Sequence, residues 1–364
     1  MFGKSWKIAT IGGIPVSVDA SWFLLGVLIV YNMGASYGDT LGTGTALAIG
    51  MLGAVLFMGS ILGHELAHAV AARLQKLPVS GIRLFMFGGA TYIKGEDKPG
   101  DEFLTTVVGP LASIAIGLGL LAASSIDGLG RPVHDVMRVV GGLNVFLGAA
   151  NLLPGFPLDG GRILHAAIWK ITGSEARATT IAAWTGMVAW GAAIAWGLWL
   201  ISIDDFGTGL WIILIGSMML QGARGTLQRQ KLFRVLERGR VAEAMGPPPE
   251  MVPVGITLSE AYDRFLRGHE DETFPVGDDF GRMIGVLTFE SASRIGRDQP
   301  LRPVRDAMLP RGDVVTVGLD DRLDKVVNEL SGVRLPAVVV QDGQIVGQIA
   351  LADIDRWLRG RALR

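Results

Sequence analysis

Cysteine is absent from the 364-residue chain, and charged residues are scarce. The missing cysteine excludes disulfide bonds and thiolate metal ligands, so a tightly bound metal would depend on histidine, aspartate or glutamate. Charged residues make up 18% of the chain and the net charge is −1, which leaves no excess of basic residues for binding nucleic acid. With 49% hydrophobic residues, the chain is too apolar for an ordinary soluble protein.

The apolar residues are concentrated in the first part of the chain. Charged residues are sparse in 1–222 and frequent in 223–364, which predicts a membrane domain, a basic linker helix over 223–240 and a soluble domain over 241–364. We expect a polytopic α-helical membrane domain with about six transmembrane helices, although the last apolar run is short for the ~20 residues that a span needs. The runs are 20–33, 45–72, 103–124, 137–153, 180–202 and 209–222.

The first apolar run has a second interpretation, a signal peptide cleaved after the small residues Gly34-Ala35-Ser36. The runs that follow favour an uncleaved helix. Segments 34–44 and 203–209 contain no lysine or arginine, and 125–136 contains only Arg131, whereas the connections on the opposite side carry several. The positive-inside rule then predicts a multi-pass protein of the cell membrane with both termini in the cytoplasm.

Two of the five histidines, His64 and His68, lie in one apolar run with Glu65 beside the first. Residues four apart share a face of a helix, so both imidazoles can reach one metal ion. Glu65 lies about 100° around the helix from His64, where its carboxylate can act as general base toward water. This is the arrangement of zinc proteases. The alternative is a chance pair of histidines, but the apolar surroundings would penalise unpaired polar groups.

A catalytic zinc site needs a third protein ligand and one open position. The strongest candidate is Asp159, in segment 151–162, where prolines and glycines break the helix near the predicted cytoplasmic side. The alternative is an Asp-Gly turn at the membrane surface. Asn151 lies in an apolar helix, where its amide would bond another helix or donate to the oxyanion of a tetrahedral intermediate. His165 is close in sequence to Asp159 and could support the ligands from behind, but we favour the alternative that it is simply an interfacial residue.

Residues 78–97 do not have the pattern of a membrane span. Two short apolar stretches, 82–87 and 90–93, flank Gly88-Gly89, which predicts a membrane-associated β-hairpin. Non-helical backbone at membrane depth is tolerated only against protein or water, and a hairpin beside the histidines would satisfy that condition. The alternative is an ordinary cytoplasmic loop.

Taken together, these motifs resemble the site-2 protease family of intramembrane zinc metalloproteases. The resemblance covers about residues 1–222. It is carried by the histidine motif, by Phe87-Gly88-Gly89, by the Gly-Pro-Leu-Ala-Ser segment 109–113, and by the Asn-Leu-Leu-Pro-Gly-Phe-Pro-Leu-Asp-Gly-Gly-Arg segment 151–162.

The resemblance implies roles for individual residues. His64, His68 and Asp159 would be zinc ligands, Glu65 the catalytic base and Asn151 a stabiliser of the transition state. The hairpin would present the substrate backbone. Ser113 stands where the family often has asparagine, a departure that we expect to touch no ligand.

The C-terminal part contains a duplicated unit. Segment 241–245 matches 304–308, 274–276 matches 335–337, and 285–287 matches 347–349, so the offsets stay between 61 and 63 residues. Each unit alternates short apolar strands with polar helices, an α/β pattern that resembles a tandem pair of cystathionine-β-synthase (CBS) domains, about 241–300 and 304–364.

Such pairs often bind adenine nucleotides through a Gly-x-x-Thr-x-x-Asp pattern, which is split here. Thr288 stands in the first unit and Asp353 in the second. The resemblance implies a site for ATP, ADP or AMP near these residues. A dimerisation or docking module is the alternative.

The patterns predict an intramembrane zinc metalloprotease that cleaves transmembrane segments of membrane-tethered substrates. The resemblance implies a tethered signalling or transcription-regulatory factor as substrate, and the CBS pair as a regulatory module that also suits homodimerisation. The rival function is a metal-ion transporter with CBS regulatory domains, suggested by histidine and aspartate within the membrane. A transporter gains nothing from Glu65 beside the metal ligands.

Overall fold

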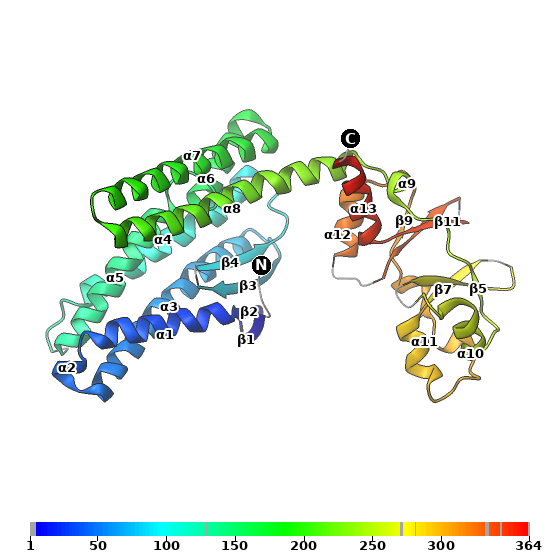
Figure 1. Ribbon diagram of the computed structural model, residues 1–364, viewed down its shortest axis with the longest axis horizontal. Coiled ribbons are helices and arrows are strands. Elements are labelled where there is room, and N and C mark those ends of the chain that lie inside the picture. Colours follow the sequence, from blue (N-terminus) through cyan, green and yellow to red (C-terminus); the bar gives the residue numbers. More distant parts are fainter. Residues whose placement is uncertain are drawn as a thin grey trace. The chain divides into compact units, whose positions relative to one another are not determined.

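The structure, a computed structural model, consists of two compact units, Met1–Gln230 and Lys231–Arg364 (Figure 1). We describe each unit by itself. The residues described are 5–86, 88–128, 130–269, 272–280, 282–331, 335–342 and 344–362.

The first unit contains a four-stranded sheet in the order β1-β2-β3-β4. The β3–β4 pair is the predicted antiparallel hairpin, although Phe87 lies outside the described residues. The β1–β2 hairpin precedes the first apolar run and was not predicted; β2 joins the other hairpin by parallel pairing with β3. The strands are β1 (Ser5–Ile11), β2 (Ile14–Asp19), β3 (Val79–Phe85) and β4 (Gly88–Ile93).

Each of the six predicted apolar runs falls on a helix, although runs 103–124 and 137–153 extend one and two residues beyond the ends of α4 and α5. Among the residues that the structure describes, four helices (α3, α4, α7 and α8) have the length and composition of membrane spans, and α1 is a shorter apolar helix. The count of six crossings therefore stays a prediction. The helices are α1 (Ala20–Ala35), α2 (Gly38–Leu41), α3 (Thr43–Leu74), α4 (Pro99–Ala123), α5 (Arg131–Asn151), α6 (Asp159–Thr172), α7 (Glu175–Ser202) and α8 (Phe206–Arg238).

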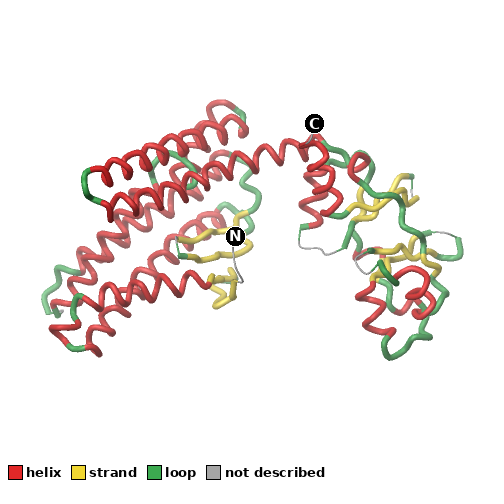
Figure 2. Tube along the Cα trace, in the orientation of Figure 1, coloured by secondary structure: helices red, strands yellow, loops and turns green. Residues whose placement is uncertain are grey.

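An apolar core attaches the sheet to the helices. Val16 and Val18 of β2 and Ile82 of β3 are buried in one cluster with Trp22 of α1 and Ile61 of α3. Along β2, buried apolar residues alternate with half-buried ones up to Val18, as expected for a strand with one covered face. The β3–β4 hairpin therefore lies beside α3 (Figure 2), close to the histidine motif.

The segment between α5 and α6 is fixed by α7. The amide of Phe156 donates to the carbonyl of Ala182 at 3.3 Å, and the indole of Trp190 donates to the carbonyl of Phe156 at 3.1 Å. A Cβ on Gly186 would lie 2.2 Å from that same carbonyl, so the approach requires glycine. This packing sets where α6, and with it Asp159, begins.

The second unit repeats one α/β arrangement. The antiparallel pairs β6–β7 and β10–β11 are the corresponding hairpins of the two halves, and α8 extends into this unit through the predicted linker. The first half contains α9 (Val241–Ala244), β5 (Val252–Pro253), α10 (Leu258–Ala261), β6 (Thr273–Gly277), β7 (Met283–Thr288), α11 (Phe289–Gly296) and β8 (Leu309–Pro310). The second contains β9 (Thr316–Val317), α12 (Leu323–Leu330), β10 (Ala337–Gln341), β11 (Gln344–Ile349) and α13 (Leu351–Ala362).

Two leucines of the first half test its core. Leu287 is 0% exposed and Leu301 is 80% exposed. Leu287→Ala should lower the free energy of unfolding of this unit by about 2–5 kcal/mol, because it removes buried methyl groups and leaves a cavity. Leu301→Ala should change it by less than about 0.5 kcal/mol. Limited proteolysis of the purified protein across a urea gradient measures both; equal midpoints for the two variants would contradict the assigned core.

Candidate metal centre

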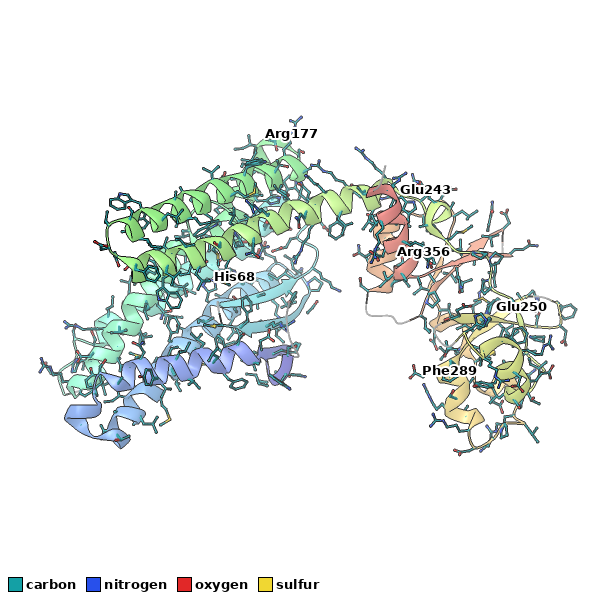
Figure 3. All side chains as sticks on the ribbon, viewed as in Figure 1. His68, Arg177, Glu243, Glu250, Phe289 and Arg356 are labelled. Atoms are coloured by element: carbon teal, nitrogen blue, oxygen red, sulfur yellow. The ribbon has the colours of Figure 1, made fainter. Side chains whose placement is uncertain are left out.

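His64 and His68 of α3 and Asp159 of α6 form a compact group of metal-binding side chains. Their candidate ligand atoms all lie within 4.8 Å of one another. The Nε2 atoms of the histidines are 3.1 Å apart, and Asp159 Oδ2 lies 3.1 Å from His64 Nε2 and 3.4 Å from His68 Nε2. His68 lies within the helical part of the first unit (Figure 3). The structure thus brings Asp159 next to His64, from which it is separated by 95 positions in the sequence.

The other ring nitrogen of each histidine has a partner on α4. His64 Nδ1 lies 2.8 Å from Ser113 Oγ, and His68 Nδ1 lies 2.7 Å from the carbonyl oxygen of Thr105. Such partners fix the orientation of an imidazole and leave Nε2 for a metal. The expectation that Ser113 touches no ligand candidate is therefore wrong, because its hydroxyl contacts His64 directly.

The space between the histidines suits a zinc ion. Two imidazole nitrogens and one carboxylate oxygen are a ligand set of catalytic zinc sites, with one position left open. The wall of the site on α4 is Gly109, where a Cβ would lie 2.2 Å from His68 Nε2 and 2.8 Å from His64 Nε2. The chain therefore keeps this wall free of side-chain atoms at the nitrogens that would bind the metal.

Asp159 is the first residue of α6. Burial alone would raise the pKa of its carboxyl, but the hydrogen bonds with His64 and His68 outweigh burial and hold the pKa below its usual range. The carboxylate is therefore ionised at neutral pH, which is the form that binds a metal.

Glu65 is buried and held by the β3–β4 hairpin. Thr91 Oγ1 of β4 donates to Glu65 Oε2 at 2.6 Å. A Cβ on Gly89 would lie 2.4 Å from Glu65 Cγ, so the strand approaches this side chain as closely as glycine allows. The predicted hairpin thus contacts the predicted base, which has a fixed place next to the three-residue group.

Asn151 is the last residue of α5 and is half-buried. It precedes the segment that leads to Asp159, so it belongs to the same region of the fold. Its part in catalysis stays a prediction.

Four polar residues near Asp159 were missed or misread in the sequence. His165 was expected to be interfacial, but it is 6% exposed and its Nδ1 lies 2.6 Å from Glu102 Oε2. Arg162 forms ion pairs with Glu96 at 2.5 Å and Glu102 at 3.6 Å. The sequence did contain a signal for this cluster. Asp159, Arg162 and His165 are spaced three residues apart, which places them along one stripe of a helix.

Thr288 and Asp353 act locally in the second unit. The hydroxyl of Thr288 accepts from the amide of Ser291 at 3.0 Å, and Ser291 Oγ accepts from the amide of Thr288 at 3.1 Å, which caps α11. Asp353 Oδ2 accepts from the amide of Ala350 at 2.9 Å at the start of α13. Each residue therefore already has a role as a helix cap, in a different half of the unit.

Comparison with known families divides the chain in the same two parts. The family model "Peptidase family M50" matches residues 52–129 and 129–192. The model "CBS domain" matches residues 241–295 and 304–360.

Relatives match over nearly the whole length. A Synechocystis sp. protein, named among the zinc metalloproteases, is 30% identical over 98% of this chain and 96% of its own. A Mycobacterium tuberculosis protein, also so named, is 31% identical over 96% and 92%. Among solved structures, the site-2 protease from Methanocaldococcus jannaschii is 26% identical and covers 61% of this chain and 95% of that chain, with a TM-score of 0.44.

A pair of glycines on α4 tests the metal centre. Gly109→Ala should lower zinc affinity at least tenfold, because the added Cβ overlaps the Nε2 atoms of both histidines. Gly119→Ala is the control, since a Cβ at Gly119 meets open space on the same helix. Competition with a chromophoric chelator measures the dissociation constants. Equal zinc affinity in the two variants would show that the metal does not occupy this space.

Proposed function

We propose that this chain hydrolyses peptide bonds within transmembrane segments of other proteins. The premise is that it belongs to peptidase family M50 and is a membrane zinc metalloprotease with a CBS pair. The premise confirms the resemblance to site-2 proteases and tandem CBS domains inferred from the motifs. The observation that carries the proposal is the position of Glu65 beside the three-residue group, on an apolar helix of membrane-spanning length.

His64, His68 and Asp159 are the residues that we assign to zinc. A zinc ion bound there supplies Lewis-acid polarisation of a carbonyl and makes water nucleophilic at neutral pH. The two α4 partners, Ser113 and the carbonyl of Thr105, hold the imidazoles with Nε2 facing Asp159.

Glu65 serves as general base and then as general acid. Its carboxylate accepts a proton from the attacking water and passes it to the nitrogen of the leaving amine. Thr91 restricts the carboxylate through its hydrogen bond to Oε2. Asn151 donates a hydrogen bond to the oxyanion that develops on the scissile carbonyl.

The substrate is a membrane-tethered protein, such as a signalling or transcription-regulatory factor. A helical segment engages its carbonyls in bonds to amides four residues on, so the segment must unwind before attack. The β3–β4 hairpin fits a role in holding the unwound segment, because the backbone of β4 lies next to Glu65 at Gly89.

The domain and membrane arrangement completes the proposal. We assign residues 1–222 to the protease domain, 223–240 to a linker and 241–364 to the CBS pair, with six crossings and both termini in the cytoplasm. The CBS pair regulates cleavage and provides a surface for a homodimer.

A metal-ion transporter would use the same ligands but not Glu65. The carboxylate of Glu65 is buried, bonded to Thr91 and closed in by Gly89. A group fixed in this way suits proton transfer to and from a reacting molecule better than release of an ion. Metal flux into vesicles, as against proteolysis by the purified protein, separates the two functions.

The first prediction from this function concerns Glu65. Glu65→Gln should reduce cleavage by ~10²–10⁴-fold while zinc content stays near one per chain, because general-base help is lost and the ligands remain. The control is Glu175→Gln, at the exposed start of α7. Cleavage of a reconstituted membrane substrate and elemental analysis measure the two quantities. Wild-type turnover in the variant would exclude Glu65 as the base.

The second prediction concerns the CBS pair. If adenine nucleotide binds near Thr288 and Asp353, it should shift the cleavage rate several-fold, within the ~1–3 kcal/mol typical of coupling between sites. Calorimetry of the full chain with ATP, ADP and AMP measures binding, and Asp353→Asn is the matched variant. No heat at millimolar nucleotide, together with a 1–222 truncation that cleaves at the full rate, would leave the pair as a docking module.

A further inference from the structure

The carboxylate of Glu96 connects the two sides of the metal centre. Its Oε1 accepts from the hydroxyl of Thr105 at 2.6 Å, and its Oε2 pairs with Arg162 Nη2 at 2.5 Å. Thr105 is the residue whose carbonyl orients His68. Arg162 lies on α6, one turn after Asp159. One side chain therefore links the segment that orients a histidine to the helix that carries the third ligand candidate.

Glu102 and His165 extend this connection. Glu102 Oε1 lies 3.6 Å from Arg162 Nε, and Glu102 Oε2 lies 2.6 Å from His165 Nδ1. His165 Nε2 lies 3.0 Å from Thr179 Oγ1 of α7. The stripe of α6 formed by Asp159, Arg162 and His165 thus contacts α3, α4 and α7 through polar groups along its length.

The inner half of the cluster, Glu102 and His165, is nearly buried, and the outer half, Glu96 and Arg162, is partly exposed. The side chains of Glu102 and His165 are 10% and 8% exposed, and those of Glu96 and Arg162 are 18% and 29% exposed. Removing Arg162 would leave the carboxylate of Glu102, which is 10% exposed, without its cationic partner, and an unpaired charge is costly in a buried place. The hydrogen bonds of the metal centre depend on the same helices, so a shift of α6 against α4 would move Asp159 relative to the histidines.

We propose that the Glu96–Arg162 pair, supported by Glu102 and His165, sets the distance between Asp159 and the two histidines and so determines zinc affinity. These four are positioning residues. The inference rests on the proposed function, because it takes His64, His68 and Asp159 as the ligands. It adds groups that contact neither metal nor substrate.

The test measures zinc affinity of the purified full-length protein by chelator competition, and the visible absorption spectrum of the Co²⁺-substituted protein. Arg162→Met should raise the zinc dissociation constant by about 10- to 100-fold, the usual effect of removing groups that orient ligands, and should alter the Co²⁺ bands. Arg162→Lys should recover part of the affinity, since it keeps the charge. Arg177→Met, an exposed position on α7, should leave both readouts unchanged.

A second variant covers loss of folding in Arg162→Met. Glu96→Gln is isosteric and keeps an acceptor for Thr105, but it removes the ion pair, so it should raise the dissociation constant in the same direction. An unchanged zinc dissociation constant and Co²⁺ spectrum in either folded variant would overturn the inference. A merely structural cluster would lower the thermal stability of the metal-free protein and leave both readouts as in the wild type.

Asp159→Ala, measured in parallel, separates failure of the inference from failure of the proposed function. If Asp159→Ala binds zinc as tightly as the wild type, the ligand assignment is wrong. If Asp159→Ala loses affinity while Arg162→Met and Glu96→Gln do not, the ligand assignment survives and the positioning role is overturned.

Discussion

Burying a polar group among apolar helices costs free energy unless its hydrogen-bonding atoms have partners, and the metal centre is arranged around that constraint. The imidazoles of His64 and His68 are satisfied at Nδ1 by α4, which directs both Nε2 atoms to Asp159. Glu65, which points elsewhere from the same helix, is satisfied by a strand. The metal centre therefore requires α3, α4, α6 and the sheet to be correctly packed at the same time.

The constraint also explains why the sheet belongs to the membrane domain. Strand backbone beside apolar helices needs hydrogen-bond partners. In the four-stranded sheet β2 and β3 are paired on both sides and the edge strands β1 and β4 on one, while the covered face packs on α1 and α3. The hairpin can then approach Glu65 without leaving unsatisfied amides on the side of β3. The protease chemistry that we propose depends on this combination of a hydrogen-bonded strand and a buried carboxylate.

Most residues of the metal centre could be predicted from local sequence patterns. The residues that support them through long-range contacts could not. His64, Glu65 and His68 could be predicted because their spacing and apolar surroundings are contained in one helical segment, and Asp159 because glycine and proline mark a break. The contact of Ser113 with His64 joins residues 49 positions apart, and the ion pair of Arg162 with Glu96 joins residues 66 positions apart. No local period in the sequence encodes such contacts. The β1–β2 hairpin was missed for a related reason: its exposed first strand lacks clear alternation, and β2 is fixed by pairing with a distant strand.

Two glycines, Gly109 and Gly89, line the metal centre where there is no room for a side chain. At Gly109 and Gly89 every other amino acid would introduce a carbon inside the contact distance of a histidine or of Glu65. Any mutation that replaces either glycine therefore adds such a carbon, so we expect no substitution at these two positions to be neutral. Genetic drift can therefore replace Gly119 of α4, where a Cβ meets open space, more readily than Gly109 or Gly89, where neighbouring side chains must move first.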